Sequence, residues 1–242
     1  MAALDYVLCD VFTDRALAGN QLAVFTDAEQ IPGDRLQPLA RELNLSETVF
    51  VLPPAAGGTA RIRIFTTVAE LPFAGHPVLG TAFVVGTSTG LDLVRLETGA
   101  GVVPIELRRE GGRVVFGRMQ QPIPTWEPFA DERKLLGALG VESSGLPVDA
   151  YRNGPLHVYV ELENEAAVAA LKPDIGALGE LTQGGVNCFA GSGKRWKTRM
   201  FGPGLGVAED PATGSAVGPL AVHLARHGRI RFGGEIELQQ GS

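Results

Sequence analysis

The sequence lacks the features that mark secreted, membrane-spanning and disulfide-rich proteins. Its 242 residues include only two cysteines, Cys9 and Cys188, which are too few for a disulfide scaffold. No apolar segment follows a basic N-terminus, and no apolar run approaches the roughly 20 residues that span a bilayer. We therefore expect a protein of the reducing cytoplasm that has no membrane partner.

The sequence also has no excess of positive charge. Asp and Glu number 27 against 21 Lys and Arg, and the formal net charge is −6. A surface for nucleic acid or anionic lipid needs clustered Lys and Arg, so neither is an expected partner. The one basic cluster, KRWKTR at residues 194–199, alternates basic residues with others and indicates a two-sided strand.

Short β-rich runs make up most of the chain, and 45% hydrophobic residues are enough for a sizeable core. Helices are predicted at residues 34–43 (ending at Asn44), from Gly75 into an apolar run, at 131–139, and at 214–226, closed by His227 and Gly228. Strands are predicted at residues 6–12, 22–25, 48–52, 60–65, 102–107, 113–116, 157–160 and 198–201.

Two prolines within QPIPT, at residues 121–125, predict a linker between two similar halves. The expected division is an N-terminal lobe at 1–120, a linker at 121–126 and a C-terminal lobe at 127–242. Residues 70–82 (ELPFAGHPVLGTA) and 209–221 (EDPATGSAVGPLA) align at an offset of 139 and agree at five of 13 positions, where about one is expected by chance. Upstream, residues 61–65 resemble 197–201, and residues 22–25 resemble 156–159.

This repeat predicts an α+β fold of two pseudo-symmetric lobes, each a curved antiparallel sheet or barrel around one central apolar helix. A helix that is apolar on all sides must be buried, and a sheet wrapped around it would bury it. The alternative is that any two strand–loop–helix units look alike, but the similarity extends beyond one motif.

The repeated segments place polar residues at the starts of two apolar helices. A helix N-terminus exposes backbone N–H groups with partial positive charge, and Gly75 and Gly214 would let a ligand approach them closely. Two such starts facing one cleft would hold a carboxylate, with His76 beside one and Asp210 and Ser215 beside the other. The alternative is that Ser215 and Thr213 only cap the second helix and that His76 is a satisfied polar group.

Seven motifs distributed along the chain are informative together. Three are NLSET (44–48), ELPFAGHP (70–77) and EDPATGSA (209–216), and the others are QPIPTW (121–126), NGPLH (153–157), NCFAGSGKRW (187–196) and GPLAVHLARHG (218–228). The first three resemble motifs of the phenazine-biosynthesis PhzF family, the other four resemble the true PhzF enzymes more than the broad family, and the resemblance covers essentially the whole chain. The resemblance implies a diaminopimelate epimerase-like fold and trans-2,3-dihydro-3-hydroxyanthranilate isomerase activity in phenazine biosynthesis. It further implies a homodimer that uses no cofactor and no metal.

The resemblance also implies the roles of individual residues. Glu47 matches the family's proton-shuttling glutamate, a single carboxylate that would act first as base and then as acid on one face of the substrate ring. Without the resemblance, Glu47 would be a solvated carboxylate at a strand start. The expected catalytic residues are Glu47, His76 and Asp210, and the expected substrate-binding residues are Gly75, Gly214, Ser215 and Ser46.

The sequence departs from the family pattern at two places. Thr67 and Ala69 replace the proline and asparagine of the family's Phe-Thr-Pro-x-Asn-Glu run, a loop change that should be mild. The chain also ends at Ser242, where relatives continue with further strands. We therefore expect the sheet of the second lobe to lack its final strands and to expose an edge.

Other interpretations of the sequence are weaker. His223 and His227 have the i,i+4 spacing of a metal pair, but no third ligand is apparent nearby. The glycines at 191–193 and 202–206 match neither a phosphate loop nor a dinucleotide motif. The alternatives are an amino-acid epimerase or racemase of the same fold, which would need a cysteine at each helix start, and a non-catalytic protein that binds small acids.

Overall fold

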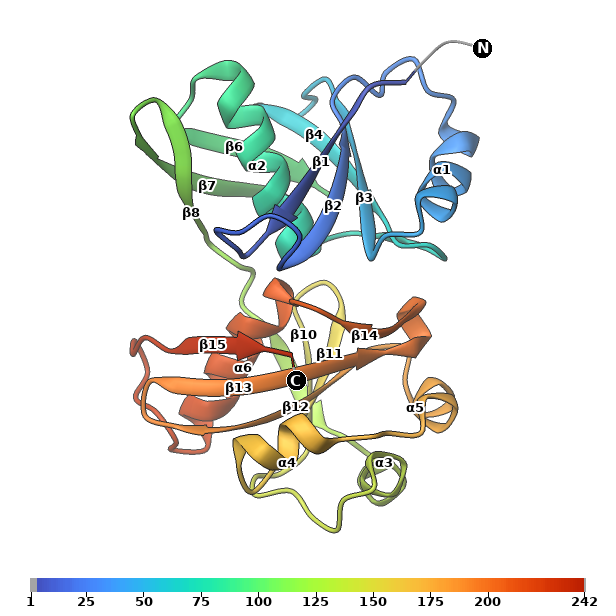
Figure 1. Cartoon of the computed structure of the whole chain (residues 1–242), viewed down its shortest axis with the longest axis vertical. Coiled ribbons are helices and arrows are strands. Elements are labelled where there is room, and N and C mark those ends of the chain that lie inside the picture. The colour runs from blue at the N-terminus through green and yellow to red at the C-terminus, as the bar shows by residue number, and fades with distance from the viewer. Residues whose placement is uncertain (1–3, 242) are drawn as a thin grey trace. The chain divides into compact units, whose positions relative to one another are not determined.

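Residues 4–241 are described by a computed structural model in which the chain forms two units (Figure 1). Unit 1 is Met1–Pro122 and unit 2 is Ile123–Ser242. Each unit has its own sheet and its own hydrophobic core.

The sheet of unit 1 has the strand order β1-β2-β3-β4-β6-β7-β8, with the short β5 beside β4. Its helices are α1 (Leu36–Leu43), which follows a 3-10 turn at Gly33–Arg35, and the central α2 (Gly75–Thr89). The strands are β1 (Tyr6–Val11), β2 (Asn20–Phe25), β3 (Glu47–Leu52), β4 (Ala60–Phe65), β5 (Glu70–Leu71), β6 (Leu93–Thr98), β7 (Gly101–Glu110) and β8 (Arg113–Met119).

The sheet of unit 2 has the order β14-β13-β12-β11-β10-β9, with β15 also paired to β13. Its helices are α3 (Glu132–Leu139), α4 (Glu165–Ala170), α5 (Ile175–Leu181) and α6 (Gly214–Arg226), with a 3-10 turn at Pro203–Leu205. The strands are β9 (Thr125–Pro128), β10 (Asp149–Arg152), β11 (Leu156–Glu161), β12 (Gly185–Ser192), β13 (Arg195–Gly202), β14 (Val207–Asp210) and β15 (Glu237–Gln240).

The two units repeat one topology, so the predicted fold class is confirmed. In unit 1, β1–β2 is antiparallel, β2–β3 parallel, β3–β4 and β4–β5 antiparallel, and β4–β6 parallel. The pairs β10–β11, β11–β12, β12–β13, β13–β14 and β13–β15 show the same series of directions. The offset of 139 residues superposes the first residue of α2, Gly75, on the first residue of α6, Gly214.

The repeat extends to individual side chains. Arg63 on β4 makes a two-pronged ion pair with Glu70, with N–O distances of 2.8 and 2.7 Å. Arg199 on β13 makes the same pair with Glu209 at 2.7 and 2.7 Å. These glutamates open the two repeated segments, so the matched Glu anchors the strand before each helix and has a structural role.

The central helix of unit 1 is buried, as predicted. Helix α2 contacts β1, β2, β3, β6, β7 and β8, so that the sheet curls around it (Figure 1). Alternation along β3 divides the two faces, because Val49 packs toward α2 while Phe50 packs on the other face with α1. In unit 2, α6 packs against Tyr151 and Tyr159, and the helices α3, α4 and α5 cover a second cluster.

The structure corrects the predicted strand directions, because both sheets are mixed and contain parallel pairs. Thr125 and Trp126, predicted to be in a linker, begin the strand β9, whose one partner strand within residues 4–241 is β10. An edge strand tolerates the proline that follows, Pro128, because one side of its backbone needs no partner. The strands β5, β6, β9, β10, β12, β14 and β15 and the helices α4 and α5 were not predicted from the sequence.

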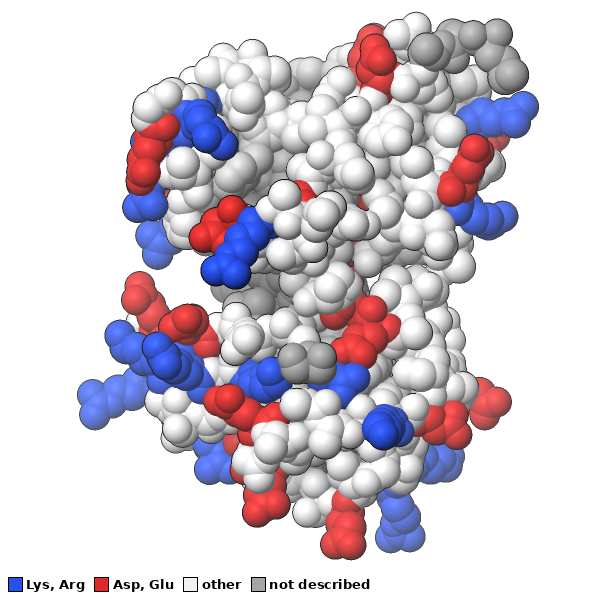
Figure 2. Space-filling model, viewed as in Figure 1, with Lys and Arg blue, Asp and Glu red and all other residues white. Residues whose placement is uncertain are grey.

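The distribution of charge agrees with the composition. Acidic and basic side chains are interspersed over the face of the molecule shown in Figure 2. The predicted two-sided strand at the basic cluster is β13, in which Arg195 is exposed while Trp196 and Arg199 are buried. Among residues 4–241, no helix has both the length and the apolar character needed to cross a membrane.

Candidate active site

The start of α2 brings together three of the predicted site residues of unit 1. The residue before the helix, Ala74, provides no side-chain cap, and the first two helical residues are the buried Gly75 and His76. The His76 ring Nε2 lies 3.5 Å from Oε2 of Glu47, and its Nδ1 lies 3.2 Å from Nδ2 of Asn20. Because an amide nitrogen only donates, Nδ1 accepts this bond, and Nε2 is the ring nitrogen that faces Glu47.

Local structure puts Glu47 in this position. Helix α1 ends at Asn44, which has a left-handed φ of 53° and turns the chain sharply. Ser46 lies in the following bend and is partly buried, and Glu47 is the first residue of β3. Only 15% of the Glu47 side chain is exposed, so this carboxylate is largely shielded from water beside His76.

The start of α6 brings together the predicted residues of unit 2. Asp210 is the last residue of β14 and is buried, and Gly214 and Ser215 are the first two residues of the helix. The Thr213 hydroxyl donates to Asp210 Oδ2 at 2.5 Å. Thr213 precedes the helix but makes no capping bond with it, so the alternative in which it serves as a cap is wrong.

Ser215 is held from two sides by residues of unit 2. Its Oγ lies 3.1 Å from Nε2 of His157, and its carbonyl oxygen accepts from Asn153 Nδ2 at 2.8 Å. The carbonyl needs this partner because the residue four positions later, Pro219, has no N–H to complete the helical bond. The proline inside α6 therefore explains the amide beside Ser215.

Strand β15 supports the same helix start through one side chain. The Gln240 amide nitrogen donates to the Asp210 carbonyl oxygen at 2.7 Å and to Thr213 Oγ1 at 2.9 Å. Its amide oxygen accepts from the Thr213 backbone N–H at 2.9 Å. The three bonds hold the loop between Asp210 and α6 in one conformation.

Five residues of this neighbourhood were not assigned a role from the sequence. Four of them bond directly to the predicted residues or to the loop that carries Asp210, and Asn187 bonds to one of the four, His157: Asn20, Asn153, His157, Gln240 and Asn187. Three of them fall in NGPLH and NCFAGSGKRW, which were recognised as motifs without a role for each residue. Membership of these motifs was the sequence signal that could have identified Asn153, His157 and Asn187 as residues of the site.

The two cysteines do not lie at the helix starts. Cys9 is on β1 and its thiol contacts the Leu22 carbonyl oxygen at 3.7 Å, while Cys188 is buried within β12. Burial, with a smaller effect of Asp10, raises the pKa of Cys9 to about 11. Burial also raises the pKa of Cys188 to about 12. Neither residue provides a thiolate near neutral pH.

The structure supplies a third potential ligand for the histidine pair on α6, which the sequence did not reveal. Asp149 joins His223 and His227, and one potential ligand atom of each residue lies within 4.8 Å of the others. Asp149 Oδ2 already accepts from Arg226 Nη1 and His227 Nε2, each at 3.0 Å. A guanidinium on the same oxygen repels a cation, so we interpret the cluster as an ion-pair network at the end of α6.

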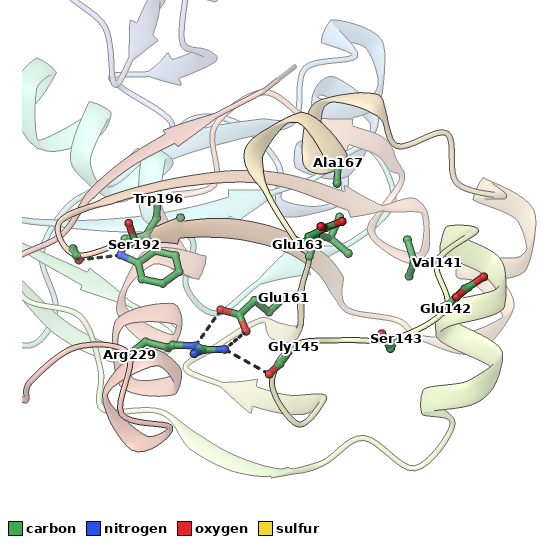
Figure 3. Close-up of a pocket in the computed structure, with 13 residues that line it drawn as sticks. Val141, Glu142, Ser143, Gly145, Glu161, Glu163, Ala167, Ser192, Trp196 and Arg229 are labelled. Atoms are coloured by element: carbon green, nitrogen blue, oxygen red, sulfur yellow. Dashed lines mark hydrogen bonds and ion pairs between the residues drawn. The ribbon is translucent and has the colours of Figure 1, made fainter.

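A cavity of about 740 Å³ in unit 2 lies apart from the predicted residues, and none of them lines it (Figure 3). Its lining includes the ion pair between Glu161 and Arg229, with an N–O distance of 2.7 Å, and the acidic residues Glu142 and Glu163. Three carboxylates against one guanidinium disfavour an anionic ligand. The cavity is therefore a poor site for an organic acid.

Solved structures define the class of fold. A PhzF-family phenazine biosynthesis protein from Bacillus anthracis superposes with a TM-score of 0.79 at 25% identity, covering 93% of this chain and 81% of that one. A predicted epimerase from Pseudomonas aeruginosa gives a TM-score of 0.81 at 30% identity, covering 96% and 85%. A probable proline racemase from Agrobacterium radiobacter, at 15% identity and a TM-score of 0.63, shares the fold alone.

Sequence comparisons then identify the family. Residues 9–242 match the PhzC-PhzF model, described as phenazine biosynthesis-like protein. The trans-2,3-dihydro-3-hydroxyanthranilate isomerase of Pseudomonas aeruginosa is 56% identical over 98% of this chain and 85% of its own length, and that of Pseudomonas fluorescens is 52% identical over the same shares. The chain belongs to the phenazine biosynthesis-like PhzC-PhzF family, as the motifs predicted.

Proposed function

We propose that this protein is an isomerase that moves a proton and a double bond in trans-2,3-dihydro-3-hydroxyanthranilate, giving an amino-oxo-cyclohexene carboxylate for phenazine biosynthesis. The observation that carries this proposal is the 56% identity to an enzyme of that name over 98% of the chain. The pairing of Glu47 with His76 at the start of α2 supports it, because the reaction needs a positioned proton carrier.

In the proposed reaction, Glu47 carries the proton. Its carboxylate removes a proton from one ring carbon and returns it to another carbon on the same face, so that one residue serves as base and then as acid. The enol that results tautomerises to the ketone. The Nε2–H of His76 holds the Glu47 carboxylate in one orientation, which reduces the reorganisation needed during the transfer.

The two helix starts are proposed to bind the substrate carboxylate. The backbone N–H groups at Gly75 and Gly214 carry the positive ends of the α2 and α6 dipoles, and they would stabilise charge that spreads onto the carboxylate in the transition state. Ser215 would add a hydrogen bond to the same group, and Ser46 would contact the substrate beside Glu47. His76 and Asp210 would orient the ring hydroxyl and amino groups.

The experiment that tests this function incubates the purified protein with dihydro-hydroxyanthranilate in D2O. Ketonisation of the enol places a solvent deuteron on the ring by itself, so the informative position is the ring carbon that receives the proton from Glu47. Deuterium at that carbon supports a proton-shuttling enzyme in which Glu47 exchanges with solvent. Isomerisation without deuterium at that carbon keeps the catalysis but requires strictly internal proton return. Saturable binding without turnover would contradict the proposal and favour a protein that only binds small acids.

An amino-acid epimerase of the same fold is the alternative. Its mechanism needs two thiols at the helix starts, whereas Cys9 and Cys188 lie on strands and have raised pKa values. The second residues of α2 and α6 are His76 and Ser215, not cysteines, and this favours the isomerase over the epimerase. We also propose that the protein is a homodimer, as the family resemblance implies, and that it resides in the reducing cytoplasm, as its two unpaired cysteines favour.

A further inference from the structure

The hydrogen bond between His157 and Ser215 has a direction, and that direction decides what Ser215 offers a ligand. His157 lies on β11 with 1% of its surface exposed, and its Nε2 is 3.1 Å from Ser215 Oγ. If Nε2 accepts, the serine proton is used and only lone pairs remain for the ligand. If Nε2 donates, the serine proton is available to an anion.

Asn187 on the neighbouring strand β12 determines the direction. Its amide Nδ2 lies 3.1 Å from the Gly185 carbonyl oxygen, 3.4 Å from His157 Nδ1 and 3.5 Å from the Val158 carbonyl oxygen. A carbonyl oxygen only accepts, so the amide nitrogen, and not its oxygen, must face Gly185 and therefore His157. Nδ1 then faces a donor and must accept.

The ring therefore carries its proton on Nε2. Burial lowers the pKa of His157 to about 3, so the ring is neutral at physiological pH and has a single proton to place. With Nδ1 accepting from Asn187, that proton sits on Nε2 and points at Ser215 Oγ.

We propose that His157 and Asn187 are positioning residues that orient the Ser215 hydroxyl. Asn187 donates to His157, His157 donates to Ser215, and the Ser215 proton is left to donate to the carboxylate of the substrate. This inference rests on the proposed role of Ser215 in carboxylate binding and names the residues that make it a donor.

Unit 1 contains the same arrangement. Asn20 Nδ2 lies 3.2 Å from His76 Nδ1, and His76 Nε2 faces Glu47. In both units an amide nitrogen faces Nδ1 of a buried histidine, and Nε2 is directed at the residue proposed to act on the substrate. The same amide–imidazole pair thus occurs in both units, and its Nε2 faces the carboxylate of Glu47 in unit 1 and the hydroxyl of Ser215 in unit 2.

The kinetic test compares two substitutions at His157. His157→Leu removes the donor, and we expect KM for dihydro-hydroxyanthranilate to rise about tenfold with a smaller fall in kcat, because a bond to a charged group is lost. His157→Gln retains an N–H group and should recover most of the affinity. In a Ser215→Ala background, His157→Leu should have little further effect on KM.

The matched control is His223→Leu, which removes another fully buried histidine of unit 2 that does not contact Ser215. It should lower the melting temperature without raising KM. Equal KM effects of His157→Leu in the presence and absence of Ser215 would overturn the proposal, as would a rise in KM for His223→Leu equal to that for His157→Leu.

A second measurement does not depend on turnover. Nitrogen-15 NMR of histidine-labelled protein should show His157 neutral, with its proton on Nε2, and calorimetry with 3-hydroxyanthranilate should show the same loss of affinity for His157→Leu. A proton on Nδ1, or a charged ring at neutral pH, would overturn the inference. If the protein lacked isomerase activity, the NMR result would still decide the direction of the bond, so the two failures are distinguishable.

Discussion

At the scale of single residues, the proposed chemistry depends on carboxylates that the fold holds in one orientation. Glu47 is held beside His76 and largely shielded from water. Glu97 accepts three backbone N–H bonds, from Ala55, Ala56 and Gly58, at 2.6–2.7 Å. The first carboxylate is placed for reaction, while the second fixes a loop, so their substitutions should have different consequences.

Glu47→Gln should lower kcat by about 10³-fold or more, because an amide cannot carry the proton, while binding of 3-hydroxyanthranilate changes by a few-fold at most. Steady-state kinetics and calorimetry on the same preparation measure both effects. A variant with a near-normal rate would remove Glu47 from the mechanism.

His76→Ala should lower affinity and rate together, because the imidazole is proposed both to contact the substrate and to orient Glu47. Its kcat/KM should fall by about 10²-fold or more. His227→Ala serves as the control, since His227 bonds to Asp149 in unit 2 and has no proposed contact with substrate. Unchanged catalytic efficiency in His76→Ala would count against both roles.

Glu97→Gln should make stability less dependent on acid pH. The backbone N–H of Ala55, followed by those of Gly58 and Ala56, holds the pKa of Glu97 below its ordinary value of 4.5. A lowered pKa means that the stabilisation is complete above about pH 4.5 and is lost as pH falls through the folded-state value.

The measurement for Glu97 is thermal unfolding of the wild type and Glu97→Gln at pH 7 and in steps below pH 4.5. The variant should melt a few degrees lower at pH 7, and the difference should shrink in acid. The exposed Glu106, on β7, provides the control substitution Glu106→Gln. A difference in melting temperature that is constant across this range would refute the assignment.

At the scale of elements, α6 is fixed at both ends by side chains from distant segments of unit 2. Asn153 and Gln240 hold its start, and Asp149 on β10 holds its last turn through Arg226 and His227. The Arg226 guanidinium also stacks on the Trp126 ring at 3.2 Å from its centroid. Cationic groups in the last turn of a helix interact favourably with its dipole, and Asp149 neutralises them.

Asp149→Asn should therefore destabilise the protein by about 2 kcal/mol, measured by urea unfolding, since Arg226 loses its counter-charge while retaining some contact with solvent. Asp92→Asn is the control, because Asp92 pairs with Arg109 through a largely exposed side chain and should cost less than about 0.5 kcal/mol.

Thermal unfolding of the wild type and of Asp149→Asn with and without Zn²⁺ tests the metal alternative at Asp149. Because the guanidinium of Arg226 already donates to the Asp149 carboxylate, Zn²⁺ should not bind there, and added Zn²⁺ should not raise the wild-type melting temperature. A zinc-dependent rise that Asp149→Asn abolishes would show that the cluster is a metal site after all.

At the scale of the whole molecule, the chain is one topology used twice. The counterparts of β1 to β6 in unit 1 are β10 to β15 in unit 2, with the same pairing directions. Among residues 4–241, β7 and β8 have no counterpart in unit 2, where β15 is the last strand and pairs only with β13.

The proposed homodimer is tested by size-exclusion chromatography with light scattering. The expected mass is twice the 25.5 kDa of one chain. A single species at the monomer mass across the micromolar range would contradict the prediction, and it would leave the isomerase proposal to be judged by the D2O experiment alone.

The sequence alone determined the family, the fold class and the two helix starts. The bounds of α6 at Gly214–Arg226 and the end of α1 at Asn44 were both predicted. Such boundaries leave a local signal, because glycine, proline and asparagine favour the backbone conformations that start or end a helix. The offset of 139 residues located both starts before any contact was known. The roles of Glu47, His76, Asp210 and Ser215 remain predictions for the kinetic experiments.

Only the tertiary structure decided what surrounds those residues. The bonds Asn20–His76, His157–Ser215 and Asn187–His157 join residues 56, 58 and 30 positions apart. Such contacts depend on which strands pair and in what register, and the parallel pairing that sets Gly185 opposite His157 leaves no local signal in the chain. Sequence therefore located the groups proposed to do the chemistry, while the packing of distant strands decided which way their protons point.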